Sequence, residues 1–175
     1  MAKRKKSFGM ILRNSNCKVI TFLPEDRPDI LRTLHAAQYN HINYDTISWF
    51  DFDCISVLQD GDDIVGFSSI WHREEHYEKG EVRILNRYWE DNSLRRGGRD
   101  LARSHILTMV SDQLKYAKEL GYTKAFISRE KNPRVFKELI NKIAIGTNTE
   151  WHIHDKRVPV CEGDGCLQFK GYTKL

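Results

Sequence analysis

The segment with the most distinctive chemistry is a short turn that combines arginines with glycines, Asn92-Ser93-Leu94-Arg95-Arg96-Gly97-Gly98-Arg99-Asp100. A strand-like stretch precedes it and a long helical pattern follows. A helix N-terminus offers unpaired backbone N–H groups and partial positive charge. Glycines let the backbone approach a ligand closely, and arginines neutralise phosphate oxygens. Together these features favour a diphosphate ligand. A solvated basic turn and an RNA-binding Arg-Gly segment are the alternatives, although such RNA-binding segments are usually repeated.

Cysteines and histidines near the C-terminus are the candidates for a metal site. Cys161 and Cys166 flank a turn sequence and can face each other across a hairpin, and His152 and His154 precede them. Cys and His are the usual ligands of zinc. However, the strand between His154 and Cys161 would span about 23 Å, at about 3.3 Å per residue. We therefore expect no metal, and interpret the two cysteines as reduced thiols or a facultative disulfide.

The elements that position these residues follow from the apolar periodicity. Strand-like runs are expected at 17–23, 52–58, 64–71, 81–89, 124–128, 150–160 and 167–173. Helical spacing is expected from 26 to about 39, at 101–120, and from 133 to Gly146, which would end that helix. A strand, a long helix and another strand imply a parallel crossover in a mixed sheet. The segment 81–89 is apolar on both faces, so it is expected at the centre of the sheet.

The composition is that of one ordinary globular domain. The chain has 175 residues, of which 40% are hydrophobic and 30% are charged. We expect a basic N-terminal tail at 1–14 and a single domain at 15–175. No apolar run approaches the roughly 20 residues of a membrane span, and no signal-like stretch follows the basic start. We expect a cytoplasmic protein without a membrane partner. Because the net charge is only +4, nucleic-acid binding is less favoured.

The order of elements, together with the Arg/Gly turn, resembles the GNAT superfamily of acyl-CoA-dependent N-acetyltransferases. The resemblance covers nearly the whole chain outside the tail. It implies an α/β (α+β) fold with a mixed, mostly antiparallel sheet of six to seven strands flanked by helices, in which a β-α-β crossover binds the cofactor. It also implies acetyl-CoA as acyl donor and a primary amine of a small molecule or protein as acceptor. GNAT domains often pair through their C-terminal strands, so a homodimer through 151–160 is a further expectation.

The resemblance assigns the cofactor site to the turn and its neighbours. The family's turn reads Arg/Gln-x-x-Gly-x-Gly/Ala, and Arg95 and Gly98 match its Arg and its first Gly. Asp100 departs from the pattern, because it replaces the small closing residue. The implied cofactor-binding residues are Arg87, Tyr88, Trp89, Arg95, Arg96, Gly97, Gly98, Arg99 and Asn132. Asn132 is equally interpreted as an ordinary helix N-cap before Pro133.

The resemblance also implies catalytic roles. Acyl transfer to an amine needs a base for the attacking ammonium and a donor for the thioester oxygen. A backbone N–H between Arg87 and Trp89 would be the donor. Glu81 is the nearest match to the glutamate that some members use as base, and Tyr88 is the other proton carrier on the strand. The alternatives are a solvated Glu81 at a strand start, which is favoured, and an aromatic core residue at position 88.

One departure from the family leaves the activity open. The tyrosine that usually protonates the leaving thiolate is replaced by Leu139, with Phe136 nearby, and neither side chain donates a proton. A catalytically degenerate acyl-CoA-binding or interaction protein is therefore an alternative to an active enzyme. A nucleic-acid-binding protein that uses the basic tail and the Arg95–Arg99 cluster is the second alternative.

The acceptor cleft is expected from the loop after the first helix and the strand that follows. Its candidates have polar or aromatic side chains suited to a cationic amine, and they are His41, Tyr44, Trp49, Asp51 and Asp53. Asp51 and Asp53 alternate with Phe50 and Phe52, so both are expected on one face of a strand. A polar, solvent-facing strand edge is the favoured alternative for this pair.

Overall fold

The computed structural model describes residues 17–36, 51–72, 78–89, 99–160 and 167–175, and at 85–89 and 99–104 it describes the backbone alone. The strands are β1 (Cys17–Phe22), β2 (Cys54–Asp60), β3 (Asp63–Trp71), β4 (Glu81–Trp89), β5 (Lys124–Arg129), β6 (His152–Ile153), β7 (Val158–Pro159) and β8 (Leu167–Lys174). The helical segments are the 3-10 turn η1 (Pro24–Asp26), α2 (Pro28–Ala36), α4 (Arg99–Glu119) and α5 (Pro133–Thr147).

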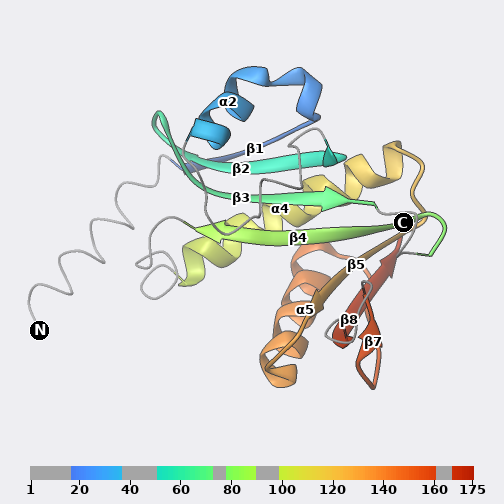
Figure 1. Ribbon diagram of the computed structural model, residues 1–175. Coiled ribbons are helices and arrows are strands. Elements are labelled where there is room, and N and C mark those ends of the chain that lie inside the picture. Colours follow the sequence, from blue (N-terminus) through green and yellow to red (C-terminus); the bar gives the residue numbers. More distant parts are fainter. Residues whose placement is uncertain (1–16, 37–50, 73–77, 90–98, 161–166) are drawn as a thin grey trace, which may run out of the picture.

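A mixed sheet forms the centre of the fold, in the order β1-β2-β3-β4-β5-β8-β6, with β7 paired to β8 (Figure 1). The β4–β5 pairing is parallel, and the other pairings are antiparallel. α4 connects the two parallel strands, because a parallel connection needs a crossover. The predicted mixed, mostly antiparallel sheet, its β-α-β crossover and the central place of 81–89 are confirmed.

The predicted strand 150–160 is two short strands in the structure. β6 and β7 both pair with β8, and exposed charged residues separate them at a bend, Asp155 and Lys156. Pro159 has no backbone N–H to donate to a ladder, which limits the length of β7. The sheet therefore has eight strands where the sequence predicts six to seven.

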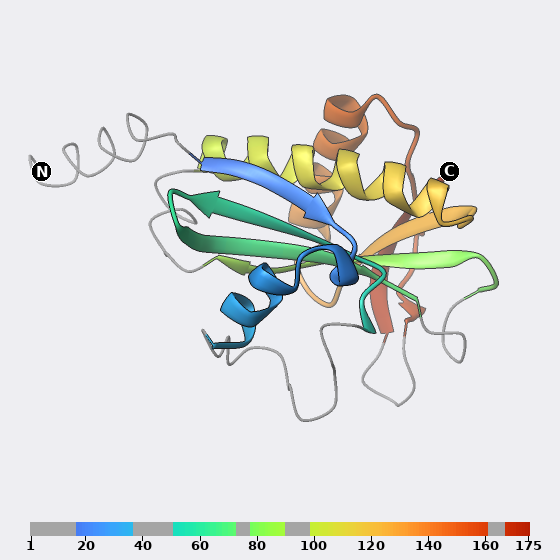
Figure 2. The ribbon, with the colours of Figure 1, turned by 90° about the horizontal axis from the view of Figure 1, so that it is seen from above.

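Helices cover both faces of the sheet (Figure 2). α4 and α5 lie on one face, and α2 lies on the other. The core on the α4 and α5 face contains the buried residues Cys54, Ile70, Val82, Ile84, Val110, Leu114, Ala117, Ala125, Ile127, Phe136, Ile140 and Ile143. The core under α2 contains Phe22, Ile30, Leu31, Leu34, Phe52, Ile55, Val57, Ile64 and Phe67. Because successive strand residues point to opposite faces, the residues between those of the first core face away from α4 and α5.

The last helix does not end at Gly146, so that prediction is wrong. α5 continues to Thr147, and Asn148 ends it with a left-handed backbone at φ 51°. Gly146 instead permits a close approach between α5 and α4. A Cβ at this position would lie 2.7 Å from Cδ1 of Leu107.

Candidate functional site

β4 and β5 separate soon after they begin, and this separation is the centre of the candidate site. Parallel pairing is confined to Glu81 with Lys124, Val82 with Ala125, and Arg83 with Phe126. β4 continues to Trp89 and β5 to Arg129, without further pairing between their described residues. Figure 1 shows the two strands diverging from their shared end. The backbone groups that face the separation are therefore available to an extended ligand.

A β-bulge lies in the same strand, where β4 pairs with β3. Phe67 pairs with Tyr88 and Ser68 pairs with Asn86, so Arg87 is the extra residue between them. A bulge redirects the backbone groups of a strand, and bulges are frequent beside active sites. This bulge coincides with the segment 87–89, which the sequence predicts as the source of a backbone N–H donor. The side chains of 87–89 are outside the described part of the chain.

The two ends of the predicted diphosphate turn are in place. β4 ends at Trp89 and α4 begins at Arg99, which is described by its backbone alone. Both views put the start of α4 at the end of the sheet toward which β4 points (Figures 1 and 2). A helix N-terminus at this position suits an anion. The remaining predicted ligands of the turn lie outside the described residues, at Arg95, Arg96, Gly97 and Gly98.

Asn132 lies between β5 and α5, and it is not an ordinary N-cap. Its backbone is left-handed, at φ 59° and ψ 67°, and its side chain makes no capping hydrogen bond. An ordinary N-cap residue has an extended backbone and caps the helix through a side-chain oxygen. The backbone carbonyl oxygen of Asn132 accepts a hydrogen bond from the Phe136 N–H, at 3.0 Å. The exposed Asn132 side chain is therefore not committed to the helix.

Glu81 begins β4 and is buried, with 1% of its surface exposed. Its Oε1 accepts a hydrogen bond from Nζ of Lys170 at 2.7 Å, and Nζ of Lys124 lies 3.8 Å from its Oε2. Lys170 is 8% exposed, and its ammonium lies 4.3 Å from the centroid of the Phe126 ring. The favoured interpretation of Glu81 as a solvated residue is therefore wrong. A cation from β8 compensates the burial of the carboxylate, as a buried charge requires.

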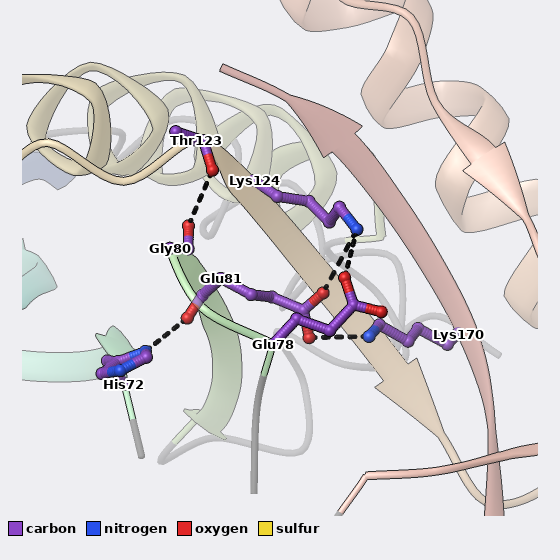
Figure 3. A network of polar contacts seen from close by, with 7 residues as sticks. All are labelled: His72, Glu78, Gly80, Glu81, Thr123, Lys124 and Lys170. Atoms are coloured by element: carbon purple, nitrogen blue, oxygen red, sulfur yellow. Dashed lines mark hydrogen bonds and ion pairs between the residues drawn. The ribbon is translucent and has the colours of Figure 1, made fainter. Parts of the chain in front are cut away.

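A second ion pair ties the segment that precedes β4 to β5 (Figure 3). Nζ of Lys124 donates to Oε2 of Glu78 at 2.6 Å. This hydrogen bond lowers the pKa of Glu78 and raises the pKa of Lys124, because it favours the charged form of each group. The backbone carbonyl of Gly80 accepts hydrogen bonds from the backbone N–H groups of Thr123 and Lys124, at 2.9 and 3.2 Å.

A polar cluster lies where β4 and β5 begin to separate. Nη2 of Arg83 donates to Oε1 of Gln168 at 3.2 Å, and Oγ of Ser128 donates to the same oxygen at 2.7 Å. Nε of Arg83 is buried and has no hydrogen-bond partner among the described residues. Arg83, Ser128 and Gln168 come from three adjacent strands, β4, β5 and β8. The cluster presents hydrogen-bond donors beside the separation.

Asp51 and Asp53 precede β2, so the prediction that both lie on one face of a strand is wrong. Asp51 is exposed, whereas the Asp53 carboxylate is partly buried and accepts a hydrogen bond from Tyr122. Burial raises the pKa of Asp53, and the Tyr122 hydrogen bond and the nearby His72 oppose this effect. His72 Nδ1 donates to the backbone carbonyl of Glu81 at 2.5 Å. Asp53 thus belongs to a cluster where β4 begins. The other acceptor candidates are outside the described residues, at His41, Tyr44 and Trp49.

The described residues hold no group of three or more His, Cys, Asp or Glu side chains that would bind a metal ion. His152 and His154 contact the Tyr172 ring, each with centroids 5.3 Å apart, and Cys161 and Cys166 lie outside the described ranges. None of the described helices combines the length and the apolar composition that a bilayer crossing requires.

The polar residues of β8 and their partners on neighbouring strands are part of the site but are not among the residues predicted from the sequence. Gln168, Lys170, Tyr172 and Lys174 alternate with less polar residues along β8. This period of two indicates a polar face, and it is a signal that was present in the sequence. The partners of that face on β4 and β5, among them Arg83 and Ser128, depend on the strand order and carry no local signal.

No family model matches this chain, and no curated protein sequence matches it. Solved structures do match in fold. An acetyltransferase from Bacillus subtilis in complex with CoA is 16% identical, at a TM-score of 0.53, and the match covers 90% of this chain and 99% of that chain. Ard1 from Thermoplasma volcanium is 16% identical at a TM-score of 0.51, with 91% and 97% covered. The IAA acetyltransferase from Bacillus cereus is 14% identical at 0.50, with 91% and 100% covered. The chain therefore has the GNAT fold that its order of elements predicts.

Proposed function

We propose that this protein is an N-acetyltransferase that transfers the acetyl group of acetyl-CoA to a primary amine by direct attack. The observation that carries the proposal is the separation of β4 from β5, with a bulge in β4 and the start of α4 at the same end of the sheet. This arrangement occurs in a fold that the chain shares with a CoA-bound acetyltransferase.

The residues present fit the cofactor. The pantetheine arm of CoA carries amide groups, and unpaired strand edges bind such groups as they bind a further strand. β4 beyond Arg83 and β5 beyond Phe126 offer such edges. Arg95, Arg96, Gly97 and Gly98, which precede α4 in the sequence, and Arg99, its first residue, would hold the diphosphate. Asn132, whose side chain makes no capping bond, would contact the cofactor from the start of α5.

Acyl transfer then uses groups of β4. A backbone N–H at the bulge, within Arg87, Tyr88 and Trp89, would donate to the thioester oxygen as negative charge develops there. Glu81 would accept the proton of the attacking ammonium through water. Its Oε1 is held by Lys170, whereas its buried Oε2 has no hydrogen-bond partner among the described residues. Tyr88 would be the second proton carrier of the strand.

Direct attack is favoured over a covalent intermediate on Cys54. Cys54 is fully buried, and burial raises the pKa of its thiol to about 12. A thiol with this pKa is not ionised near neutral pH, and the thiolate is the nucleophile. We therefore assign no catalytic role to Cys54.

One observation favours a second candidate, a CoA-binding protein without acetyltransferase activity. Leu139 and Phe136 occupy the part of α5 where the usual general acid is expected, and Phe136 is buried in the core. Tyr88 would have to replace that acid in an active enzyme.

The experiment that tests the function measures thiol release from acetyl-CoA in the presence of a panel of primary amines. Amine-dependent release, with the acetylated amine identified by mass spectrometry, supports the enzyme. In folded Glu81→Gln protein, CoA affinity should be unchanged and turnover should be slower. CoA binding without amine-dependent release from any amine would support the inactive binder instead. Unchanged turnover in Glu81→Gln would remove Glu81 from the mechanism.

A further inference from the structure

We propose that Arg83 and Gln168 bind a carboxylate of the acceptor, so that the acceptor is an amine that also carries a carboxylate. The inference rests on the proposed function, because it names the class of substrate that the same site takes. Where β4, β5 and β8 meet, some of the cations of the described residues pair with carboxylates and one does not.

Among the described residues, the ion pairs of this region and Arg83 bring together three cations and two carboxylates. Lys124 pairs with Glu78 at 2.6 Å, and Lys170 pairs with Glu81 at 2.7 Å. Arg83 is the third cation, and no carboxylate of the described residues forms an ion pair with it. Its one polar contact among the described residues is with the neutral amide of Gln168. A guanidinium that is partly buried without an anion favours a ligand that supplies one.

Within the part of the chain that the structure describes, the hydrogen bonds of the cluster leave donors without acceptors. Gln168 Oε1 accepts from both Arg83 and Ser128, which sets the orientation of the amide and leaves its Nε2 as a donor. Nε of Arg83 is buried and without a partner in the described part of the chain. A buried donor without an acceptor is costly, so an oxyanion that accepts from Arg83 and Gln168 would remove that cost.

The diphosphate of CoA does not reach this cluster. Arg83 precedes Trp89, the last residue of β4, by six positions, which is about 20 Å at about 3.3 Å per residue. The predicted diphosphate turn follows Trp89. Arg83 is also the last residue of β4 that pairs with β5, so its anion would lie where the strands separate. The reacting amine is expected at this separation, and the anion is therefore a group of the acceptor.

The side chains of the cluster share one face of the sheet. Val82 and Ile84 pack in the core beneath α4 and α5, so Arg83 between them points to the opposite face. Gln168 accepts hydrogen bonds from both Arg83 and Ser128, so Gln168 and Ser128 lie on that face too. An arginine fork matches a planar carboxylate in two parallel hydrogen bonds, which favours a carboxylate as the ligand.

The test compares amino acids with their carboxamides as acceptors. Thiol release from acetyl-CoA is measured for each pair, and rates are compared per unprotonated amine because the amide lowers the amine pKa. We expect kcat/KM to be about 10- to 100-fold higher for the carboxylates, the range that one charged hydrogen bond gives. Phosphoethanolamine, a primary amine that carries a phosphate, tests whether the site prefers that oxyanion to a carboxylate. A preference for it over the amino acids would overturn the assignment to a carboxylate.

Variants connect the preference to the cluster. Arg83→Gln should reduce the ratio between each amino acid and its amide to about one, Arg83→Lys should restore part of it, and Gln168→Met should give an intermediate ratio. Lys118→Gln removes one charge from the exposed last turn of α4 and should leave the ratio unchanged. A ratio near one in the unmodified protein, or a ratio that Arg83→Gln does not change, would overturn the proposal.

A binding measurement separates this proposal from the proposed function. The N-acetylated amino acids and their carboxamides are titrated against CoA-loaded protein by calorimetry, which needs no turnover. Binding of a carboxylate that Arg83→Gln abolishes supports the site even if no amine is acetylated, and then only the enzymatic function fails. Equal binding of both series, or binding of neither, would overturn the carboxylate site.

Discussion

The carboxylate of Glu81 on β4 reaches across β5 to the ammonium of Lys170 on β8, with 2.7 Å between Oε1 and Nζ. The ammonium lies over the Phe126 ring of the intervening strand, 4.3 Å from its centroid. The ion pair therefore joins three strands at the point where β4 and β5 are still paired. It fixes the end of the sheet from which the two strands diverge (Figure 3).

Removing one partner of this pair should destabilise the protein strongly. Glu81→Gln leaves the Lys170 ammonium buried without its anion, and Lys170→Met leaves the Glu81 carboxylate without its cation. Each change should lower the free energy of unfolding by about 3–5 kcal/mol. The double variant removes both charges, so it should lose much less than the sum of the two. Urea unfolding measures all four proteins, and additive losses would contradict a direct interaction.

Gly80→Ala should destabilise the protein more than the same change at Gly61. Both glycines have positive φ, 76° and 59°, so each alanine has a backbone cost of about 1–2 kcal/mol. Only at Gly80 does the added Cβ meet a neighbour, Oγ1 of Thr123 at 2.7 Å, whereas the space around Gly61 is open. Thr123→Ala should remove the excess loss of Gly80→Ala. Equal midpoints of thermal unfolding for the two glycine variants would show that the contact is unimportant.

Asp53→Asn should stabilise the protein near neutral pH and not in acid. Because burial raises the pKa of Asp53 above its ordinary value of 3.8, the folded state binds this proton more tightly than the unfolded state. The contribution of Asp53 to stability is therefore fully present below pH 3.8 and is lost as the pH rises through the raised pKa. The asparagine does not titrate, so its advantage should grow over the same range. Thermal unfolding from acid to neutral pH measures it, with the exposed Asp62→Asn as control. A gain that is the same at every pH would contradict this explanation.

Cys54 should resist alkylation in the folded protein. It is fully buried and its pKa is raised to about 12, so it offers neither access nor thiolate. Iodoacetamide should modify Cys54 only in denaturant, whereas the partly exposed Cys17 should react before Cys54 does. Peptide mass spectrometry measures the modification of each cysteine. Rapid modification of Cys54 in native buffer would show that β2 opens readily.

Local signals explain why most of the fold is predictable. The Asp60-Gly61 step between two apolar runs predicts the β2–β3 hairpin, and Gly61 has the positive φ that such a turn requires. The apolar stripe of α4 between two strands predicts the parallel crossover. In contrast, glycine is a residue type that typically ends helices, but Gly146 lies within α5 and allows the helix to approach Leu107 closely. That contact depends on how two helices pack, which a single helical pattern does not contain.

The candidate site is less predictable, because its groups are distant in the sequence. The Arg/Gly turn has a local signature, and its flanking elements are where the sequence predicts them. The family resemblance identifies Glu81 as a candidate base, but its burial depends on Lys170, 89 positions away. Arg83 and Gln168 are 85 positions apart and meet only because β8 lies beside β5. Such contacts follow from the strand order, which the sequence states only indirectly.

The measurement that tests the central claim most directly is a calorimetric titration with acetyl-CoA. The unmodified protein should bind with micromolar affinity, and Arg95→Glu with Arg96→Glu should abolish binding while the protein stays folded. Lys5→Glu with Lys6→Glu makes the same change of charge in the basic N-terminal tail and should leave the affinity unchanged. No binding at millimolar acetyl-CoA, or equal affinity in the Arg95/Arg96 variant, would contradict the proposed cofactor site.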